Sequence, residues 1–117
     1  MRSDKENIIV NKTFGFALHI IEFSEILYKN HRFSLANQIF KSGTSIGANV
    51  REAQNAESKA DFIHKIKIAA KEADETEYWL LLCSQSPHLD SPDEKLFFEI
   101  KEILLILSKI LSTSKIK

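Results

Sequence analysis

The sequence predicts an all-α fold, an antiparallel up-down-up-down bundle of four helices that forms one domain over residues 1–117. Apolar residues recur at helical spacing along four stretches, which is typical of helices with one buried face. The chain holds only three Gly and two Pro, and its β-branched residues show no clean alternation, which argues against many short strands. Short connections between the four stretches favour antiparallel neighbours.

The first helix is expected over residues 4–29, with Ser3 and Glu6 spaced as a capping box. It carries two apolar stripes. One comprises Val10, Phe14, Ala17, Leu18, Ile21 and Tyr28, and the other comprises Ile9, Phe16, Ile20, Phe23 and Leu27. One stripe suffices for a surface helix of a monomer. The second stripe therefore indicates either a very wide buried arc or, as we favour, a subunit interface.

The second helix is expected over residues 34–57, with Ser34 as its N-cap and Phe33 packing in front of that cap. Two glycines inside the helix, Gly43 and Gly47, each cost about 1 kcal/mol relative to Ala. Such a cost is accepted where another backbone must come close, so we expect very tight neighbours here. The predicted core stripe is Leu35, Ile39, Ser42, Ile46, Asn49, Val50 and Ala53.

The third helix is expected over residues 59–84, where Ser58 and Asp61 resemble a capping signal and Pro87 bars continuation. Its predicted core stripe is Phe62, Ile66, Ala69, Ala73, Thr76 and Leu80. The fourth helix is expected over residues 92–112, with Ser91 as its cap and Pro92 at its first position. Its apolar stripe is wide, comprising Leu96, Phe97, Ile100, Ile103, Leu104, Leu107, Ile110 and Leu111. The apolar excess on the first and last helices predicts oligomerisation.

Composition narrows the functional classes. The 16 basic and 16 acidic residues cancel, which counts against bulk electrostatic binding of nucleic acid but permits a local basic patch. The single cysteine, Cys83, closes no intrachain disulfide and fits a structural role near the end of the third helix. We find no signal peptide and no apolar run of about 18 residues, so we expect a cytoplasmic protein without a membrane partner.

No pattern for catalysis, a cofactor or a metal is found. Helical bundles often hold di-iron sites built from Glu-x-x-His pairs, and the nearest match here is the single pair Asp61 and His64. The glycine-containing segment 42–47 lacks the Lys-Ser/Thr ending of a P-loop. We therefore expect no enzyme, no catalytic residue, no bound cofactor and no metal site.

The third helix carries a candidate nucleic-acid surface. His64, Lys67 and Lys71 share one outer stripe, with Tyr78 one to two turns further along. Basic side chains beside an aromatic ring suit phosphate contacts combined with base stacking. Three further residues can extend this patch: Lys41, Arg51 and Lys59. The alternative is an ordinary solvated helix face.

The second and third helices also carry a family resemblance. The segments Ser45-Ile46 and Asn49-Val50-Arg51-Glu52-Ala53, together with Gln38, resemble the signature of four-helix-bundle proteins related to those encoded in 23S ribosomal-RNA intervening sequences. The likeness spans about residues 12 to 112, and continues through Phe62, Ala69, Ala70, Glu75, Glu77 and Leu80. Two positions depart from the family pattern, which often has Pro at Gly47 and Gly at Gln54. The family's first connection is also often longer.

The resemblance implies a ring-like homo-oligomer, with a pentamer as the suggested number. The family is similar to the accessory variability determinants of diversity-generating retroelements, so it implies RNA or DNA and a reverse transcriptase as partners. Four of the resembling polar residues are expected to form a structural polar network: Asn49, Glu52, Glu75 and Glu77. Two functions remain open, a nucleic-acid-associated accessory module, which we favour, and a protein-protein interaction scaffold that binds no nucleic acid.

Overall fold

In the computed structural model, the backbone of residues 4–115 and the side chains of residues 8–114 are described. The described backbone forms four α-helices and no strand, which confirms the all-α fold class. The helices are α1 (Asp4–Lys29), α2 (Phe33–Ala53), α3 (Lys59–Gln85) and α4 (Glu94–Lys115).

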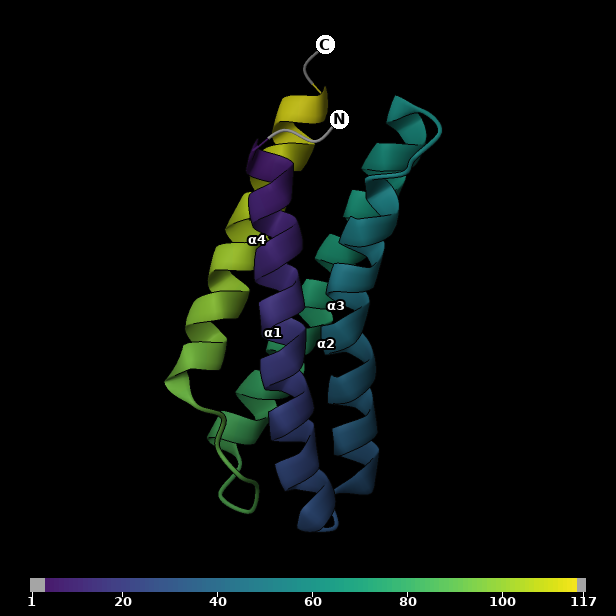
Figure 1. The fold of residues 1–117 in the computed structure, drawn as a ribbon. Coiled ribbons are helices and arrows are strands. Elements are labelled where there is room, and N and C mark those ends of the chain that lie inside the picture. Colours follow the sequence, from purple (N-terminus) through teal and green to yellow (C-terminus); the bar gives the residue numbers. More distant parts are fainter. Residues whose placement is uncertain (1–3, 116–117) are drawn as a thin grey trace.

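Each helix packs against two others along a body of 48 × 20 × 20 Å (Figure 1). The packed pairs are α1 with α2, α2 with α3, α3 with α4, and α4 with α1. Two pairs of side chains, Ser42 with Thr76 and Glu52 with Lys65, show that α2 and α3 run in opposite directions. The buried residues of all four helices form one shared core.

Helix α1 buries only one of its two apolar stripes. Ile9, Phe16, Ile20, Phe23 and Leu27 belong to the core. On the other stripe, Phe14 is 60% exposed, Leu18 50% and Tyr28 55%. The interpretation of a single wide buried arc is therefore wrong, because an arc of that width would need a third neighbour beside α2 and α4. The interface interpretation stays a prediction.

Helices α1 and α2 approach each other most closely at the two glycines of α2. A Cβ atom added to Gly43 would lie 2.7 Å from Cγ2 and 2.8 Å from Cγ1 of the buried Ile20. A Cβ atom added to Gly47 would lie 3.3 Å from Oγ1 of Thr13. The expected tight packing is thus confirmed, and α1 is the neighbour that requires it.

Two hydroxyl groups provide a polar contact inside the core. Ser42 and Thr76 are both buried, and a hydrogen bond of 2.8 Å joins their side-chain oxygens across α2 and α3. Thr76 also lies 2.7 Å from the carbonyl oxygen of Glu72. The expectation that Asn49 belongs to the same core stripe is wrong. Its side chain is half-buried and donates to the carbonyl oxygen of Ser45 in its own helix at 2.9 Å.

The first turn differs from its prediction. Helix α2 begins at Phe33, its N-cap position is Arg32, and no side chain caps it, so Ser34 lies inside the helix. The chain reverses at His31, whose φ of 66° lies in the left-handed region. Residues 31–34 are exposed, so water can satisfy the free N–H groups of the first turn without a side-chain cap. The predicted Ser3 cap lies outside the described residues.

The C-terminal end of α2 and the N-terminal end of α4 also differ from their predicted positions. Helix α2 ends at Ala53 instead of residue 57, because the following residues tighten into i→i−3 hydrogen bonds. Ser58 then caps α3, as predicted, by accepting from the backbone nitrogen of Asp61 at 3.0 Å. Helix α4 begins at Glu94 instead of residue 92. There Asp93, not Ser91, accepts from the backbone nitrogen of Lys95 at 3.0 Å, since Asp is an equally good cap.

The glycine contact predicts opposite effects for two Gly→Ala substitutions. Gly43→Ala should destabilise the fold, because overpacking a stiff buried isoleucine costs about 1–3 kcal/mol and the helix-propensity gain is only about 1 kcal/mol. Gly15→Ala is the matched control, since nothing lies within 4 Å of the added atom. It should stabilise by about 0.5–1 kcal/mol. Urea unfolding measures the free energy of unfolding of both variants. Equal changes in that free energy would contradict the close contact between position 43 and Ile20.

The buried hydroxyl pair predicts a non-additive double-mutant cycle. Thr76→Val should cost about 1–3 kcal/mol, because it leaves the Ser42 hydroxyl buried without its partner. Ser42→Ala should cost less, since Thr76 keeps the Glu72 carbonyl. The double variant should be more stable than Thr76→Val alone, because both polar groups are then gone. Additive losses in urea unfolding would exclude this coupling.

Candidate functional site

His64, Lys67 and Lys71 share one exposed stripe of α3, whereas Lys59, at the start of the helix, lies about 140° around the axis from His64. The side chains of Lys59, His64, Lys67 and Lys71 are all exposed. Tyr78 is 56% exposed and stacks edge-on against Trp79, with ring centroids 5.4 Å apart. The exposed Asp74 and Glu75 lie between Lys71 and Tyr78 along the helix. The basic group and the aromatic ring are thus separated by acidic side chains.

The two predicted residues of α2, Lys41 and Arg51, lie on different sides of the helix. Lys41 approaches α3, because its charge, with that of Lys71, opposes the upward pKa shift that burial and Glu75 impose on Glu72. Lys41 therefore lies at the α2–α3 boundary, on the side of α3 that carries Glu72. Arg51 instead lines a groove between α1 and α2. The structure does not bring Arg51 together with the α3 residues. We call Lys41, His64, Lys67 and Lys71 the basic face.

The four residues of the expected polar network each have a separate partner. Asn49 bonds to its own helix, and Glu52 pairs with Lys65 at 2.9 Å. This pairing is the largest cause of the raised pKa of Lys65. Glu75 accepts from the Trp79 indole at 3.3 Å. Glu77 lies 3.6 Å from Lys101 of α4. Because each contact is local or at the surface, these residues do not specify the core in the way that Ser42 and Thr76 do.

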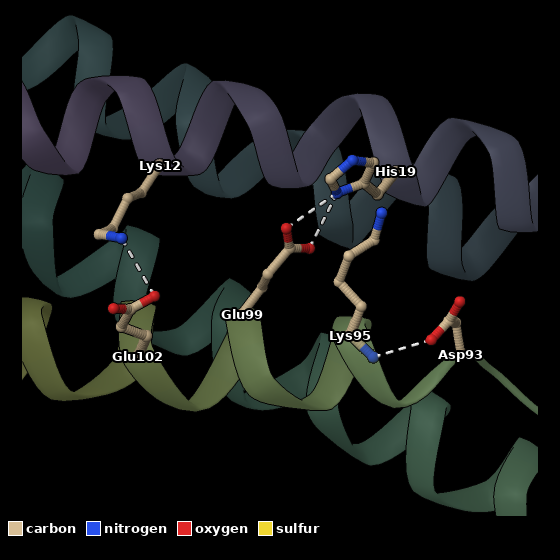
Figure 2. A network of polar contacts seen from close by, with 6 residues as sticks. All are labelled: Lys12, His19, Asp93, Lys95, Glu99 and Glu102. Atoms are coloured by element: carbon tan, nitrogen blue, oxygen red, sulfur yellow. Dashed lines mark hydrogen bonds and ion pairs between the residues drawn. The ribbon is translucent and has the colours of Figure 1, made fainter.

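A polar seam joins α1 to α4 (Figure 2). Nδ1 of His19 lies 3.0 and 2.9 Å from the two carboxylate oxygens of Glu99. Lys12 pairs with Glu102 at 3.1 Å. Both contacts are partly exposed, so they orient the two helices more than they stabilise them. His19 and Glu99 are 80 residues apart in the sequence, so no local pattern marks this pair.

Sequence reasoning also missed a groove between α1 and α2. It encloses about 390 Å³ and has a mainly apolar lining. The lining residues are Val10, Asn11, Thr13, Phe14, Ala17, Thr44, Gly47, Ala48 and Arg51. Two features of the sequence together could have predicted the groove. They are the second apolar stripe of α1, which contains Phe14, and the small residues Gly47 and Ala48 of α2. These small residues leave open space beside the exposed ring of Phe14.

The buried thiol of Cys83 is poorly suited to act as a nucleophile. Burial raises the pKa of the Cys83 thiol to about 11, and the charge of Asp90 adds to this effect. The reactive thiolate is therefore disfavoured at neutral pH. The pair Asp61 and His64 is not part of a larger cluster. Among the described residues, no group of three or more His, Cys, Asp or Glu side chains could hold a metal ion.

Over the residues that the structure describes, none of the four helices has an apolar stretch of the length needed to cross a bilayer.

Comparisons with known proteins identify the family. The sequence model of the 23S rRNA-intervening sequence protein family matches residues 5–112. No curated protein matches the chain significantly. A crystal structure of a protein of unknown function, from the S23 ribosomal protein family of Bacteroides thetaiotaomicron, is similar with a TM-score of 0.86. Its sequence is 41% identical, and the alignment covers 92% of this chain and 98% of that one. The chain therefore belongs to the 23S rRNA-intervening sequence protein family.

Proposed function

We propose that the chain is a non-enzymatic, cytoplasmic module that assembles with copies of itself and contacts nucleic acid through the basic face. The observation that carries this proposal is the exposure of three lysines on adjoining surfaces of α2 and α3: Lys41, Lys67 and Lys71. His64 lies on the same outer stripe and is also exposed. A phosphate backbone is the polyanion that such a row of cations suits.

Self-assembly explains how a chain of zero net charge binds a polyanion. In the proposed assembly each copy is an up-down-up-down bundle, and the copies form a closed ring, with five as the number that the family resemblance suggests. Every copy then presents the same basic face. Several weak sites on one assembly act together, because binding at one raises the effective concentration of nucleic acid at the next.

A second candidate function is a protein-protein interaction scaffold without nucleic acid. The apolar side chains exposed on all four helices favour it, among them Phe14, Tyr78 and Phe98. A protein partner such as a reverse transcriptase would then cover these residues. The presence of Asp74 and Glu75 beside the basic face also favours this alternative, since both weaken the attraction for phosphate.

The nucleic-acid proposal predicts a steep response to salt. Fluorescence anisotropy with a structured RNA and with duplex DNA should show binding at about 50 mM salt. For duplex DNA, three lysine contacts by a single copy predict an affinity loss of about 40-fold between about 50 and 200 mM salt, and contacts by further copies make the loss larger. Lys67→Glu combined with Lys71→Glu should abolish binding and leave the mass of the assembly unchanged. No binding by the native chain at low salt would favour the scaffold.

A matched control separates the basic face from net charge. Lys29→Glu combined with Lys95→Glu changes the net charge by the same amount, at exposed positions of α1 and α4. This variant should keep most of the native affinity. An equal loss in both double variants would contradict a localised site, because it would show that only total charge matters.

A further inference from the structure

Helix α3 carries its charges in an order that does not stabilise the helix itself. Four lysines precede position 72, and Glu72, Asp74, Glu75 and Glu77 follow, with Asp61 as the exception in the first turn. Lys67 and Lys71 are four positions apart, where like charges repel. Lys71 and Glu75 have the less favourable order for an ion pair within a helix, because the acidic residue should come first. The charge order of α3 therefore points to a partner outside the helix.

The outer face of α3 presents one stripe whose members alternate at spacings of four and three positions. This period of 3.5 residues is that of helices that pack against each other along a seam. We call these residues the α3 stripe: Ala60, His64, Lys67, Lys71, Asp74, Tyr78, Leu81 and Gln85. All eight side chains are exposed, so the stripe is available to a second helix.

The α3 stripe is complementary to itself when two copies run antiparallel. If Lys71 of one copy faces the partner's Asp74, the other positions also meet in pairs, because the spacing is the same from both ends. Lys67 then faces the ring of the partner's Tyr78, an arrangement suited to a cation–π contact. The outer pairs are His64 with the partner's Leu81 and Ala60 with the partner's Gln85. Two-fold symmetry repeats every contact.

The charges also select this register over its neighbours. A shift of seven positions in one direction places Lys67 opposite the partner's Lys71, and a shift in the other direction places Asp74 opposite the partner's Tyr78. Both shifts remove the two central ion pairs. A parallel arrangement places Lys71 against its own copy, which is repulsive. Only the antiparallel register with Lys71 opposite Asp74 joins opposite charges at the centre.

The central charges are available for a contact between copies. Among the residues that the structure describes, the ion pairs within one chain use Lys12, His19, Lys65 and Lys101 as their cations. Lys71 and Asp74 therefore have no ion pair of their own in the described chain. Glu75 adjoins Asp74 and adds a second negative charge opposite the partner's Lys71.

We propose that α3 pairs antiparallel with α3 of a second copy, and that nucleic acid must displace this copy to reach the basic face. The pairing covers Lys67 and Lys71, so a polyanion and the second copy compete for the same lysines. The competition rests on the proposed function, whereas the pairing does not. Asp74 and Glu75 thereby gain a role, since they occupy the lysines of the partner until phosphate replaces them.

The pairing is weak and reversible, because its central contacts are solvent-exposed ion pairs. It therefore requires a high protein concentration and decreases with salt. In dilute solution the assembly keeps the mass that its other contacts give it. Being two-fold symmetric, the pairing joins two copies and then stops, so it links assemblies in twos without extending them.

Exchange of the central charges tests the pairing. Lys71→Glu sets two acidic side chains against each other, and Asp74→Lys sets two basic ones, so each variant should pair with itself more weakly by a factor of about ten or more. An equimolar mixture of the two should pair like the native chain, because both ion pairs are restored across the contact. Lys29→Glu and Glu22→Lys, at exposed positions of α1, are the matched controls and should each pair like the native chain.

Sedimentation velocity at low salt measures the pairing over a range of protein concentrations. The native chain and the controls should show a species of twice the mass of the dilute assembly, which disappears between about 50 and 200 mM salt. Circular dichroism shows that every variant is folded. Absence of this species in the native chain, or a mixture of the exchanged variants that does not restore it, would overturn the proposal.

Cross-linking with a carbodiimide, which joins lysine to carboxylate directly, tests the competition. In a mixture of unlabelled and ¹⁵N-labelled native chain, a Lys71–Asp74 cross-link with one isotope in each half forms only between copies. Duplex DNA at low salt should suppress this hybrid product. An unchanged yield while anisotropy shows the DNA bound would overturn the competition.

The outcomes separate this inference from the proposed function. If the native chain pairs through α3 but binds no nucleic acid, the proposed function and the competition are wrong while the pairing stands. If it binds nucleic acid but gives neither the species of doubled mass nor the hybrid cross-link, the inference is wrong while the proposed function stands.

Discussion

The close approach of α1 to α2 at Gly43 is the constraint on which the rest of the bundle depends. Ile20 occupies the space that a side chain at position 43 would fill, and it is completely buried. This contact fixes the separation of α1 and α2 and so determines which stripe of α1 faces the core. Once the Ile20 stripe turns inward, the Phe14 stripe must face outward beside the small residues of α2. The groove is therefore a direct consequence of the glycine contact.

The sequence alone was sufficient for the helices and their buried faces, because a 3.6-residue period records burial directly. It failed where the outcome depends on the tertiary structure. Asn49 lies within the predicted stripe of α2, yet its amide bonds to its own backbone and stays half-buried. Ser34 and Ser91 are good caps in isolation, but the turn at His31 and the carboxylate of Asp93 act instead. Of the basic residues, Arg51 was misplaced because the orientation of α2 relative to α1 is not encoded locally.

The exposed surface is divided by chemistry. The basic face lies on α3 and the adjoining edge of α2, whereas most of the exposed large hydrophobic side chains lie on α1 and α4, with Tyr78, Leu81 and Leu82 of α3 among the exceptions. Proposed contacts between copies through α1 or α4 therefore need not compete with contacts of a polyanion. A neutral chain is also advantageous for such a module, because like-charge repulsion between copies is small. Zero net charge, which counts against nucleic-acid binding by one copy, favours an assembly of many.

The contact of α1 with α4 has a consequence for synthesis of the chain. α1 emerges from the ribosome first and α4 last of the four helices, yet His19 and Glu99 must meet across 80 residues. Until α4 emerges, the faces of α1 and α3 that it later covers remain open to water and to other nascent chains. Closure of the bundle must therefore wait until α4 has been synthesised. The three-helix intermediate therefore exposes apolar surface that α4 later buries, a condition that promotes aggregation.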